Sequence, residues 1–459
     1  MTSVSGCPDE LVGHLTTKCA ISPHVRAQTV ILCLAAAACA TTDSPDDTPD
    51  EASPGESFLV DGRAAGTIAE GSDQARAVLR AANRATPDEL TSKSEIGLAS
   101  KAAANVIAYR NGPDGKPHTA DDRTIATLAE LDGIPWVGRS TFDRLLAWGT
   151  KQGFAEPRSC DAGGARGISS SVVVTPDDGD ARLLAIIDGA AATIDIVVYE
   201  LSRDDVYSAL GAAVQRGVRV RVIVDGQLTQ NPAVVTRLTG LGVQAKLSSP
   251  QFTYTHQKTL VADGRVAFIF TGNFDVSSFD KGRNYAAVDT AWQDLDDLEA
   301  LFEGDWSGVA PDLTCTRLVV SPVNSRGRIL DVIGGARTHL DVEALYVTDP
   351  DVLQALIDAH KRGIAVRVLI NDPSFGFGTD AAGKQLVAAG VEARRSGALF
   401  VHAKVLLADG AAVYFGSENF SKNSLLYNRE VGAVFADTEI DVARIAAAFA
   451  SDWGRGISF

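Results

Sequence analysis

The chain has 459 residues, of which 45% are hydrophobic and 22% are charged, and its 42 Lys+Arg and 58 Asp+Glu give a formal net charge of −16. This length suffices for two to four domains with hydrophobic cores, and the composition excludes collagen-like, low-complexity and wholly disordered proteins. An acidic chain repels polyanions, which disfavours a general coat for nucleic acid.

The charge is distributed unevenly. Residues 1–57 carry 2 Lys+Arg and 8 Asp+Glu, residues 58–169 carry 14 of each, and residues 170–459 carry 26 and 36. The acidity therefore belongs to the two ends of the chain, and a local basic site stays open. The longest apolar run, residues 30–40, is shorter than the roughly 18 residues that cross a bilayer.

Residues 1–39 have the layout of an export signal. Arg26 precedes a short apolar run and small residues that lead to Cys39, and residues 40–57 form an acidic Pro/Ser tract. This layout predicts a signal followed by a disordered tether. It resembles a bacterial lipoprotein signal, which implies lipidation of Cys39 and anchoring in the cell envelope, in the periplasm or at the outer membrane. A simple secretory peptide is the alternative, and Val25 is an alternative start.

Two cysteines, Cys160 and Cys315, follow the export signal. In an oxidising compartment they could pair and tie a linker to a segment between two halves of the C-terminal region. Two unrelated buried thiols are the alternative, because sequence does not show whether the two residues are close in space.

Residues 58–156 are predicted to form a small all-α module. The segments IGLASKAAANVIAYR and LDGIPWVGRSTFDRLLAW each place a Gly-containing turn between apolar helical patterns. The pair resembles tandem helix-hairpin-helix motifs of the DNA-uptake type, which implies that backbone amides at the turns hold a DNA phosphate. The first turn contains a single glycine, Gly97. The second is interrupted by Pro135 and Trp136, and the module has no net charge. DNA binding and a structural or protein-docking role both stay open.

The rest of the chain is an internal repeat, with one copy in residues 170–312 and the other in residues 313–459. Residues 209–225 (ALGAAVQRGVRVRVIVD) answer residues 355–371 (ALIDAHKRGIAVRVLIN), 146 positions later. Strand and helix patterns alternate in each copy, which predicts an α/β fold of two lobes related by a pseudo-twofold axis. Each lobe is expected to be a sandwich of mixed, mainly parallel sheet with flanking helices, and one site is expected where the lobes meet.

Each copy contains the pattern His-x-Lys-x4-Asp. A His and a Lys two positions apart on a strand point to the same face, so both enter one cleft. Hydrolysis or transfer at a phosphodiester requires a nucleophile, positive charge on the phosphate oxygens and a proton for the leaving alkoxide. A carboxylate is expected on each imidazole Nδ1, and no metal or other cofactor is expected. The pattern residues are His256, Lys258 and Asp263 in the first copy and His402, Lys404 and Asp409 in the second.

A small polar patch follows each pattern and supplies neutral donors for the phosphate. It contains Thr271 and Asn273 in the first copy and Ser417 and Asn419 in the second. Together the two copies resemble the double HKD signature of the phospholipase D superfamily. The second copy matches this signature at every defined position, whereas the first has Phe270 and Thr271 at its Gly and Ser positions.

The resemblance implies a ping-pong mechanism in which His256 forms a phosphohistidine and His402 acts as acid and base. Glu430 lies 28 residues after His402, where nuclease-like members place a Glu that orients the histidine, so it is expected beside His402. The first copy has Asn284 at the equivalent position, so His256 is expected to use another acid. For the two Asp of the pattern, a direct catalytic role and a role in bracing the lobes both stay open.

The resemblance admits several substrates. Hydrolysis of a phospholipid to phosphatidic acid is favoured by the acidic catalytic region and by the expected envelope location, because a nuclease requires a basic groove. Nuclease activity on DNA or RNA is favoured by the helix-hairpin-helix resemblance. Phosphatidyl transfer and a non-catalytic binding module are further alternatives. The sequence does not specify an oligomeric state.

The remaining conspicuous side chains receive simpler interpretations. Glu200 and Glu343 end corresponding strands and are expected to make structural hydrogen bonds. Ordinary packing or a surface position is expected for His339 and His360. Phe252 and Tyr254 are expected to line the pocket or to pack in the core, and the arginines near the second motif are Arg394, Arg395 and Arg429.

Overall fold

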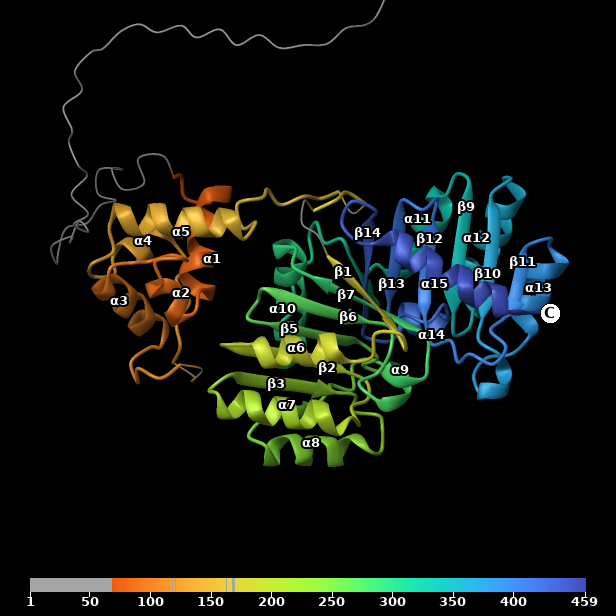
Figure 1. Ribbon diagram of the computed structural model, residues 1–459, viewed down its shortest axis with the longest axis horizontal. Coiled ribbons are helices and arrows are strands. Elements are labelled where there is room, and N and C mark those ends of the chain that lie inside the picture. Colours follow the sequence, from red (N-terminus) through yellow and green to blue (C-terminus); the bar gives the residue numbers. More distant parts are fainter. Residues whose placement is uncertain (1–67, 118, 120, 162, 167–169) are drawn as a thin grey trace, which may run out of the picture. The chain divides into compact units, whose positions relative to one another are not determined.

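The structure is a computed structural model that describes residues 68–459, except residues 118, 120, 162 and 167–169 (Figure 1). The predicted signal, Cys39 and the acidic tether lie outside the described residues. Within the described part of the chain, no helix combines the length and the apolar character needed to cross a bilayer.

The described part of the N-terminal module is all-helical. Its first two helices begin at side-chain caps that the sequence supplies: Ser72 accepts from the amide of Ala75, and Thr86 and Glu89 form a capping box. The first predicted hairpin, residues 96–110, contains the third helix, and the second, residues 131–148, contains the end of the fourth helix and most of the fifth. The helices are α1 (Asp73–Arg84), α2 (Pro87–Thr91), α3 (Ser100–Arg110), α4 (Leu128–Asp132) and α5 (Arg139–Lys151).

Basic residues of α1 contact the first lobe. Arg80 and Arg84 form ion pairs with Asp296, and Arg84 also pairs with Glu299. Trp292 of the lobe packs into the hydrophobic core of the module. These contacts agree with the structural-docking alternative for the module, and DNA binding by its turns stays a prediction.

A disulfide joins Cys160 to Cys315 across 155 positions of sequence. The pairing alternative for these two cysteines is therefore the one that the structure contains. The bond ties the segment that leads into the first lobe to the segment that leads into the second.

In the described chain, the first lobe holds a seven-stranded sheet in the order β1-β7-β6-β5-β2-β3-β4. Its elements are β1 (Ser171–Thr175), α6 (Ala181–Gly189), β2 (Thr193–Val198), α7 (Asp204–Gln215), β3 (Arg219–Val224), α8 (Asn231–Gly240), β4 (Gln244–Leu247), β5 (Lys258–Ala262), β6 (Val266–Phe270), α9 (Val276–Asp280), β7 (Asn284–Asp289) and α10 (Trp292–Ser307).

The second lobe repeats this arrangement in an eight-stranded sheet of described residues, in the order β15-β11-β10-β9-β12-β13-β14-β8. Its elements are β8 (Leu318–Ser321), α11 (Ser325–Gly335), β9 (His339–Ala344), α12 (Pro350–Lys361), β10 (Ala365–Ile370), the 3₁₀ turn η1 (Pro373–Phe375), α13 (Ala381–Ala388), β11 (Glu392–Arg395), β12 (Lys404–Ala408), β13 (Ala412–Gly416), α14 (Lys422–Leu426), β14 (Glu430–Ala436), α15 (Val442–Arg455) and β15 (Ile457–Ser458).

Both sheets are mixed, as expected, but the expectation that they are mainly parallel is wrong. Only β2-β3-β4 and β9-β10-β11 pair in parallel, and the other neighbouring strands are antiparallel. The parallel pairs are the ones joined through α7, α8, α12 and α13. The His-x-Lys strands β5 and β12 return through tight turns to β6 and β13, and such short connections force antiparallel pairing.

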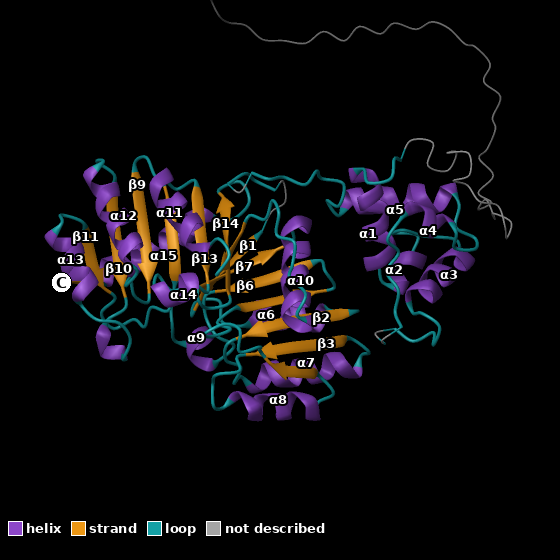
Figure 2. Ribbon diagram, turned by 180° about the vertical axis from the view of Figure 1, so that it is seen from behind, coloured by secondary structure: helices purple, strands orange, loops and turns teal. Residues whose placement is uncertain are grey.

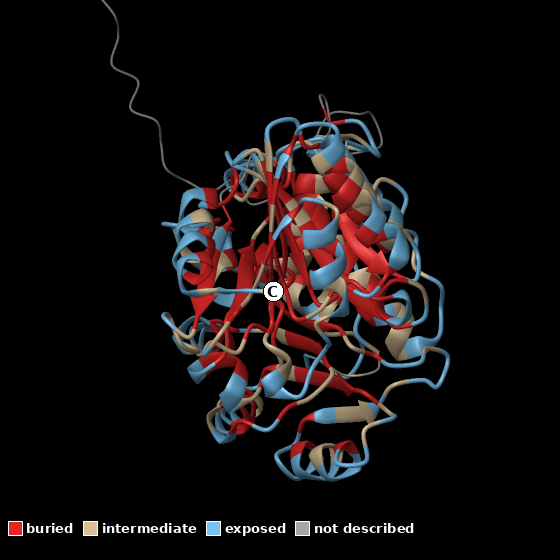
Figure 3. Ribbon diagram, turned by 90° about the vertical axis from the view of Figure 1, so that its right-hand side faces the viewer, coloured by how far each residue is buried: buried red, intermediate tan, exposed pale blue. Residues whose placement is uncertain are grey.

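The lobes share a hydrophobic core. Val172, Tyr285, Val405, Phe415 and Phe435, from strands of both sheets, belong to one buried cluster. Separate clusters lie between each sheet and its own helices. Figure 2 shows the strands of each sheet with helices beside them, and Figure 3 shows buried residues concentrated on the strands and exposed ones on the outer faces of the helices.

The two lobes exchange short backbone bridges at the ends of their His-x-Lys strands. Thr255 pairs with Arg429, and Arg283 pairs with Val401. Thr255 and Val401 are 146 positions apart, and so are Arg283 and Arg429, as expected for a pseudo-twofold relation. The bridges bring the two copies of the motif to one junction.

Candidate active site

The first histidine, His256, takes its partner from the other lobe. Its Nδ1 lies 2.7 Å from Oε2 of Glu430, the first residue of β14, and Asn428 donates a 2.8 Å hydrogen bond to the other oxygen of that carboxylate. The bridge between Thr255 and Arg429 places these residues side by side. A hydrogen bond at Nδ1 leaves Nε2 with its lone pair toward the junction.

Burial dominates the electrostatics of this pair. It lowers the pKa of His256 to about 4, although the attraction of Glu430 opposes the shift. Burial alone would raise the pKa of Glu430, but the charge and the hydrogen bond of His256 lower it below its ordinary value. The site therefore holds a neutral imidazole beside a buried carboxylate that can stabilise positive charge as it develops on the ring.

The second histidine, His402, has a different partner. Its Nδ1 lies 3.1 Å from Oδ1 of Asn284, the first residue of β7 in the first lobe. The amide group of Asn284 donates a 3.0 Å bond to the carbonyl of Ser278, which fixes the orientation of the side chain. Burial and then the charge of Lys404 hold the pKa of His402 well below its ordinary value.

The expected assignment of the orienting residues is therefore wrong. Glu430 was expected beside His402, yet it contacts His256, and a carboxylate was expected on both rings, yet His402 has an amide. The physical reason is the exchange of backbone bridges: the segment that ends in Glu430 pairs with the strand of His256, and the segment that ends in Asn284 pairs with the strand of His402. The sequence does relate the two partners to each other: Asn284 and Glu430 are 146 positions apart, so they occupy equivalent positions in the two copies of the repeat.

Both lysines of the motif are completely buried at the junction. Lys404 Nζ donates to the carbonyls of His402 at 2.6 Å and Thr271 at 3.1 Å, and Lys258 Nζ donates to the carbonyl of His256. Burial lowers the pKa of Lys258 to about 7 and holds that of Lys404 well below its ordinary value. An anionic phosphate between the lysines would favour their charged forms, so the site is suited to bind one.

The two asparagines of the polar patches retain unused acceptors. Among the described residues, Oδ1 of Asn273 and Oδ1 of Asn419 are buried and have no hydrogen-bond partner. The amide group of Asn273 lies 3.5 Å from Glu200, whose pKa is raised by burial. Buried polar atoms without partners are costly, so these two side chains are candidates to contact substrate or water.

The hydroxyls of the polar patches are engaged within the protein, and Thr271 Oγ1 donates a 3.1 Å hydrogen bond to Oδ1 of Asn284, the partner of His402. Thr271 Oγ1 accepts from the amide of Tyr285 at 3.0 Å, and Ser417 Oγ accepts from the amide of Val431 at 3.1 Å. Both residues are completely buried. Their expected role as phosphate ligands has no support in these contacts, which join neighbouring strands at the base of the site.

The acids of the motif lie at the far ends of their strands. Asp263 follows β5 and accepts from the amides of Ala191, Ala192 and Thr193 at 2.7–2.9 Å. Both Asp263 and Asp409 have φ of +56°, so each closes a tight turn. The five residues of β5 separate Asp263 from the histidine end, so its interpretation as a catalytic residue is corrected to lobe bracing.

Asp409 repeats this arrangement after β12. It accepts from the amides of Arg337, Thr338 and His339 at 2.7–3.0 Å and from the hydroxyl of Thr338. These bonds lower the pKa of Asp409 below its ordinary range although burial opposes them. The catalytic alternative for Asp409 is corrected in the same way.

Two buried glutamates have pKa values raised well above that of a free glutamate. Glu343 accepts from the Tyr285 hydroxyl at 2.7 Å, which confirms its expected structural bond, and burial raises its pKa to about 8. Glu418 lies between Ser417 and Asn419, accepts from the Tyr414 hydroxyl at 2.8 Å and also has a pKa raised by burial to about 8. The sequence reasoning did not single out Glu418.

The arginines near the site form ion pairs with acids or donate hydrogen bonds to backbone carbonyls. Arg429 pairs with Asp305 at 2.9 Å, and Arg283 pairs with Asp177 at 2.9 Å and also with Asp452. Two further arginines named from the sequence are also engaged: Arg394 donates to the carbonyl of Trp453 and Arg395 pairs with Asp380. These four arginines are therefore not unpaired cations of the kind that line a groove for a polyanion.

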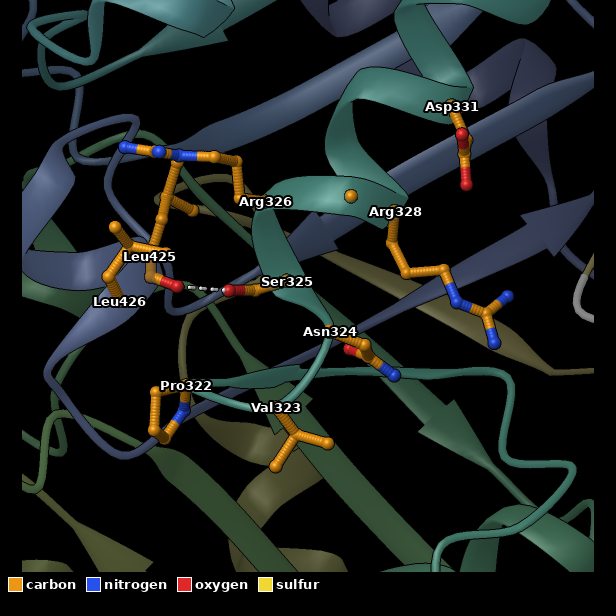
Figure 4. A pocket seen from close by; sticks show the side chains of 10 residues that line it. Pro322, Val323, Asn324, Ser325, Arg326, Arg328, Asp331, Leu425 and Leu426 are labelled. Atoms are coloured by element: carbon orange, nitrogen blue, oxygen red, sulfur yellow. Dashed lines mark hydrogen bonds between the residues drawn. The ribbon is translucent and has the colours of Figure 1, made fainter.

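A cavity of about 390 Å³ lies elsewhere, at the start of α11. Figure 4 shows its lining, including the hydrogen bond from the Ser325 hydroxyl to the carbonyl of Leu425. None of its lining residues belongs to either His-x-Lys pair. Within the described residues, no group of three or more His, Cys, Asp or Glu has the arrangement of a metal site.

Comparison with known proteins agrees with this geometry. The family model described as "Cardiolipin synthase, PLD-like domain" matches residues 183–306 and 329–453. The minor cardiolipin synthase ClsB of Bacillus subtilis is 24% identical over 314 residues, which are 59% of this chain and 78% of that protein. Phospholipase D Z of Dictyostelium discoideum is 30% identical over 158 residues, but these are 27% of this chain and only 37% of that protein.

Solved structures show a weaker similarity. The phosphatidylserine synthase of Haemophilus influenzae aligns with a TM-score of 0.47 and 12% identity, over 62% of this chain and 85% of that one. The match to the family model covers more than half of the 459 residues and includes both His-x-Lys pairs. The chain therefore belongs to the phospholipase D superfamily.

Proposed function

We propose that the protein transfers the phosphatidyl group of a phospholipid through a covalent intermediate on His256. The observation that carries this proposal is the convergence of two His-x-Lys pairs, one from each lobe, at a junction where the histidines have unequal partners. The carboxylate of Glu430 stabilises positive charge on His256, as a nucleophile requires. His402 lacks such a partner and its pKa is low in the free protein, but the negative phosphate of a bound substrate would raise that pKa, so that the ring carries the proton that it donates.

In the first half of the reaction, Nε2 of His256 attacks phosphorus and the bond from phosphorus to the head-group oxygen breaks. His402 gives its proton to the departing oxygen, while Lys258 and Lys404 hold the non-bridging oxygens. In the second half, His402 takes the proton of an acceptor hydroxyl. The acceptor oxygen then attacks phosphorus, the bond to nitrogen breaks, and His256 is regenerated.

A phospholipid substrate is favoured over nucleic acid by the paired state of the surrounding arginines. Transfer to an alcohol is favoured over the hydrolysis expected from the sequence by the similarity to cardiolipin synthases. Water would give phosphatidic acid through the same intermediate. Export and lipid anchoring through Cys39 would place the enzyme beside its substrate, and Cys39→Ser should release the protein from the envelope fraction.

The test incubates the purified full-length protein with phosphatidylglycerol vesicles and, separately, with single-stranded DNA. Mass spectrometry of the lipids should show cardiolipin and released glycerol. Phosphatidic acid as the main product would make the enzyme a hydrolase, and cleavage of DNA without lipid turnover would overturn the lipid proposal. EDTA is expected to leave the reaction intact, because lysines supply the positive charge.

A further inference from the structure

Exposed aromatic side chains surround the two histidines. Phe375 and Phe377 are 37% and 47% exposed, and Tyr254 and Tyr427 are 36% and 48% exposed. We refer to these four residues as the aromatic rim. Isolated exposed apolar residues are normal, but a group of them beside a reaction centre marks a surface that another molecule covers.

The rim connects to the histidines through ring contacts. Phe375 and Phe377 lie with their ring centres 5.5 and 5.8 Å from that of Phe400, which in turn lies 5.8 Å from the His402 ring. The Tyr254 ring is 5.9 Å from the Tyr199 ring, which lies 4.6 Å from the ring of His256. The rim is therefore the outer edge of the reaction site.

Tyr427 extends the rim on the side of Tyr254. The carbonyl of Tyr427 accepts a 3.0 Å bond from the amide of Thr253, and the carbonyl of Tyr254 accepts a 2.8 Å bond from the amide of Arg429. These two bonds place a residue of the second lobe beside the segment that leads into His256. Both lobes thus contribute residues to the rim.

The phenylalanines belong to a loop of the second lobe that is longer than the equivalent loop of the first lobe. Residues 371–380 connect β10 to α13, whereas residues 225–230 connect β3 to α8. The longer loop contains Phe375-Gly-Phe377-Gly, with both glycines at positive φ, and the shorter one contains no aromatic residue. Core packing does not explain this addition, because both side chains retain more than a third of their surface exposed.

Exposed lysines accompany the aromatic residues. Lys281 is next to Gly282, which lies close to the Phe400 ring, since a Cβ added at Gly282 would be 3.1 Å from that ring. Lys422 is the first residue of α14, the helix that ends just before Tyr427. Phenylalanine favours the acyl region of a bilayer, while tyrosine and lysine favour its head-group level, where lysine also attracts anionic lipid. A single-stranded nucleic acid would require unpaired cations along a groove, and the nearby arginines are paired.

We propose that the aromatic rim docks on the surface of an anionic phospholipid bilayer and holds the lobe junction against the lipid phosphates. This proposal rests on the proposed function for the identity of the substrate. It goes further because it names the surface that meets the membrane and assigns most of that contact to the second lobe.

The experiment compares the full-length protein with the double variant Phe375→Ser/Phe377→Ser. The matched control is Leu241→Ser/Leu247→Ser, which removes two side chains that are 38% and 37% exposed on the first lobe and lie outside the rim. Binding is measured by co-sedimentation with phosphatidylglycerol/phosphatidylcholine vesicles. Turnover is measured on the same vesicles and on a short-chain phosphatidylglycerol below its micelle concentration.

The rim variant should bind vesicles about tenfold more weakly, and its ratio of vesicle to monomer turnover should fall by a similar factor. The control variant should retain the binding and the ratio of the unchanged protein. Equal vesicle binding by all three proteins would overturn the proposal. So would an equal loss of turnover on vesicles and on the monomer, because that result would place the phenylalanines in the chemistry.

A second variant covers the case in which the double variant does not fold. Phe377→Trp retains an aromatic ring, and its added fluorescence should shift to shorter wavelength when vesicles are present. Leu247→Trp should show no shift, and an absent shift in Phe377→Trp would contradict docking. Vesicle binding does not depend on turnover, so a protein that binds vesicles without lipid turnover refutes the proposed function and leaves the docking proposal intact.

Discussion

The two lobes have the same sheet topology around the motif and the same caps at Asp263 and Asp409, yet they differ where they meet substrate. The first lobe gives His402 an amide partner, Asn284, and the second gives His256 a carboxylate, Glu430. The loop after the second parallel strand is polar in the first lobe and contains two phenylalanines in the second. The repeat therefore preserved the framework while the residues at the junction diverged, so two copies of one unit can perform different steps.

The largest expected effect follows the loss of either histidine, and a second substrate distinguishes their roles. His256→Asn and His402→Asn should each lower turnover of phospholipid by at least about 10³-fold, because one removes the proposed nucleophile and the other the proposed proton donor. A p-nitrophenyl phosphodiester has a leaving group that needs no proton. On that substrate His402→Asn should release a burst of p-nitrophenol as the covalent intermediate forms, although the second half stays slow, and His256→Asn should release none. The opposite pattern would exchange the two roles.

The next effect concerns the carboxylate partner. Glu430→Gln should lower kcat about 10²-fold, because an amide stabilises a positively charged imidazole less than a buried carboxylate does. The same variant should accumulate less covalent intermediate when the reaction is quenched with denaturant at alkaline pH, where a bond between phosphorus and histidine nitrogen is stable. Unchanged intermediate levels would show that Glu430 only supports the fold, and circular dichroism serves as the control for folding.

A smaller effect is expected for the amide partner. Asn284→Asp places a carboxylate beside His402, and a negative neighbour raises the pKa of a histidine. A proton donor is active while it is protonated, so the alkaline limb of kcat/KM should move to higher pH, with kcat changed only a few fold. A shift of the acidic limb instead would identify His402 as the nucleophile.

The smallest effect on activity is expected at Asp263 and Asp409, the turn-closing acids that the two lobes share. Asp263→Asn and Asp409→Asn retain a residue that tolerates positive φ but lose charged acceptors, so each should lower the free energy of unfolding by about 1–2 kcal/mol with kcat nearly unchanged. A large loss of kcat in a folded variant would restore a catalytic role for these acids.

The pH dependence of Asp409→Asn follows from the lowered pKa of the native carboxyl. A carboxyl whose pKa is lower in the folded state stabilises the fold above its unfolded pKa of about 4, and this contribution disappears as the pH falls through the folded value. The difference in urea stability between Asp409→Asn and the unchanged protein should therefore be full at pH 7 and should narrow below about pH 4.

Local patterns were sufficient to predict much of the molecule. The alternation of strands and helices gave the α/β class, the offset of 146 residues gave two lobes, and the two-residue spacing placed His256 with Lys258 and His402 with Lys404 on one face. Strand direction did not follow from these patterns: helical crossovers make β2-β3-β4 parallel, whereas the tight turn that returns β5 to β6 makes that pair antiparallel.

The sequence by itself determined which side chains have the chemistry of phosphoryl transfer, because that information lies in residue type and short-range spacing. Only the tertiary structure decided which partner each histidine receives: Glu430 is 174 positions from His256, and Asn284 is 118 positions from His402. These pairs form because each lobe contributes a backbone bridge to the strand of the other. A contact between lobes depends on the packing of two sheets, which no local pattern encodes.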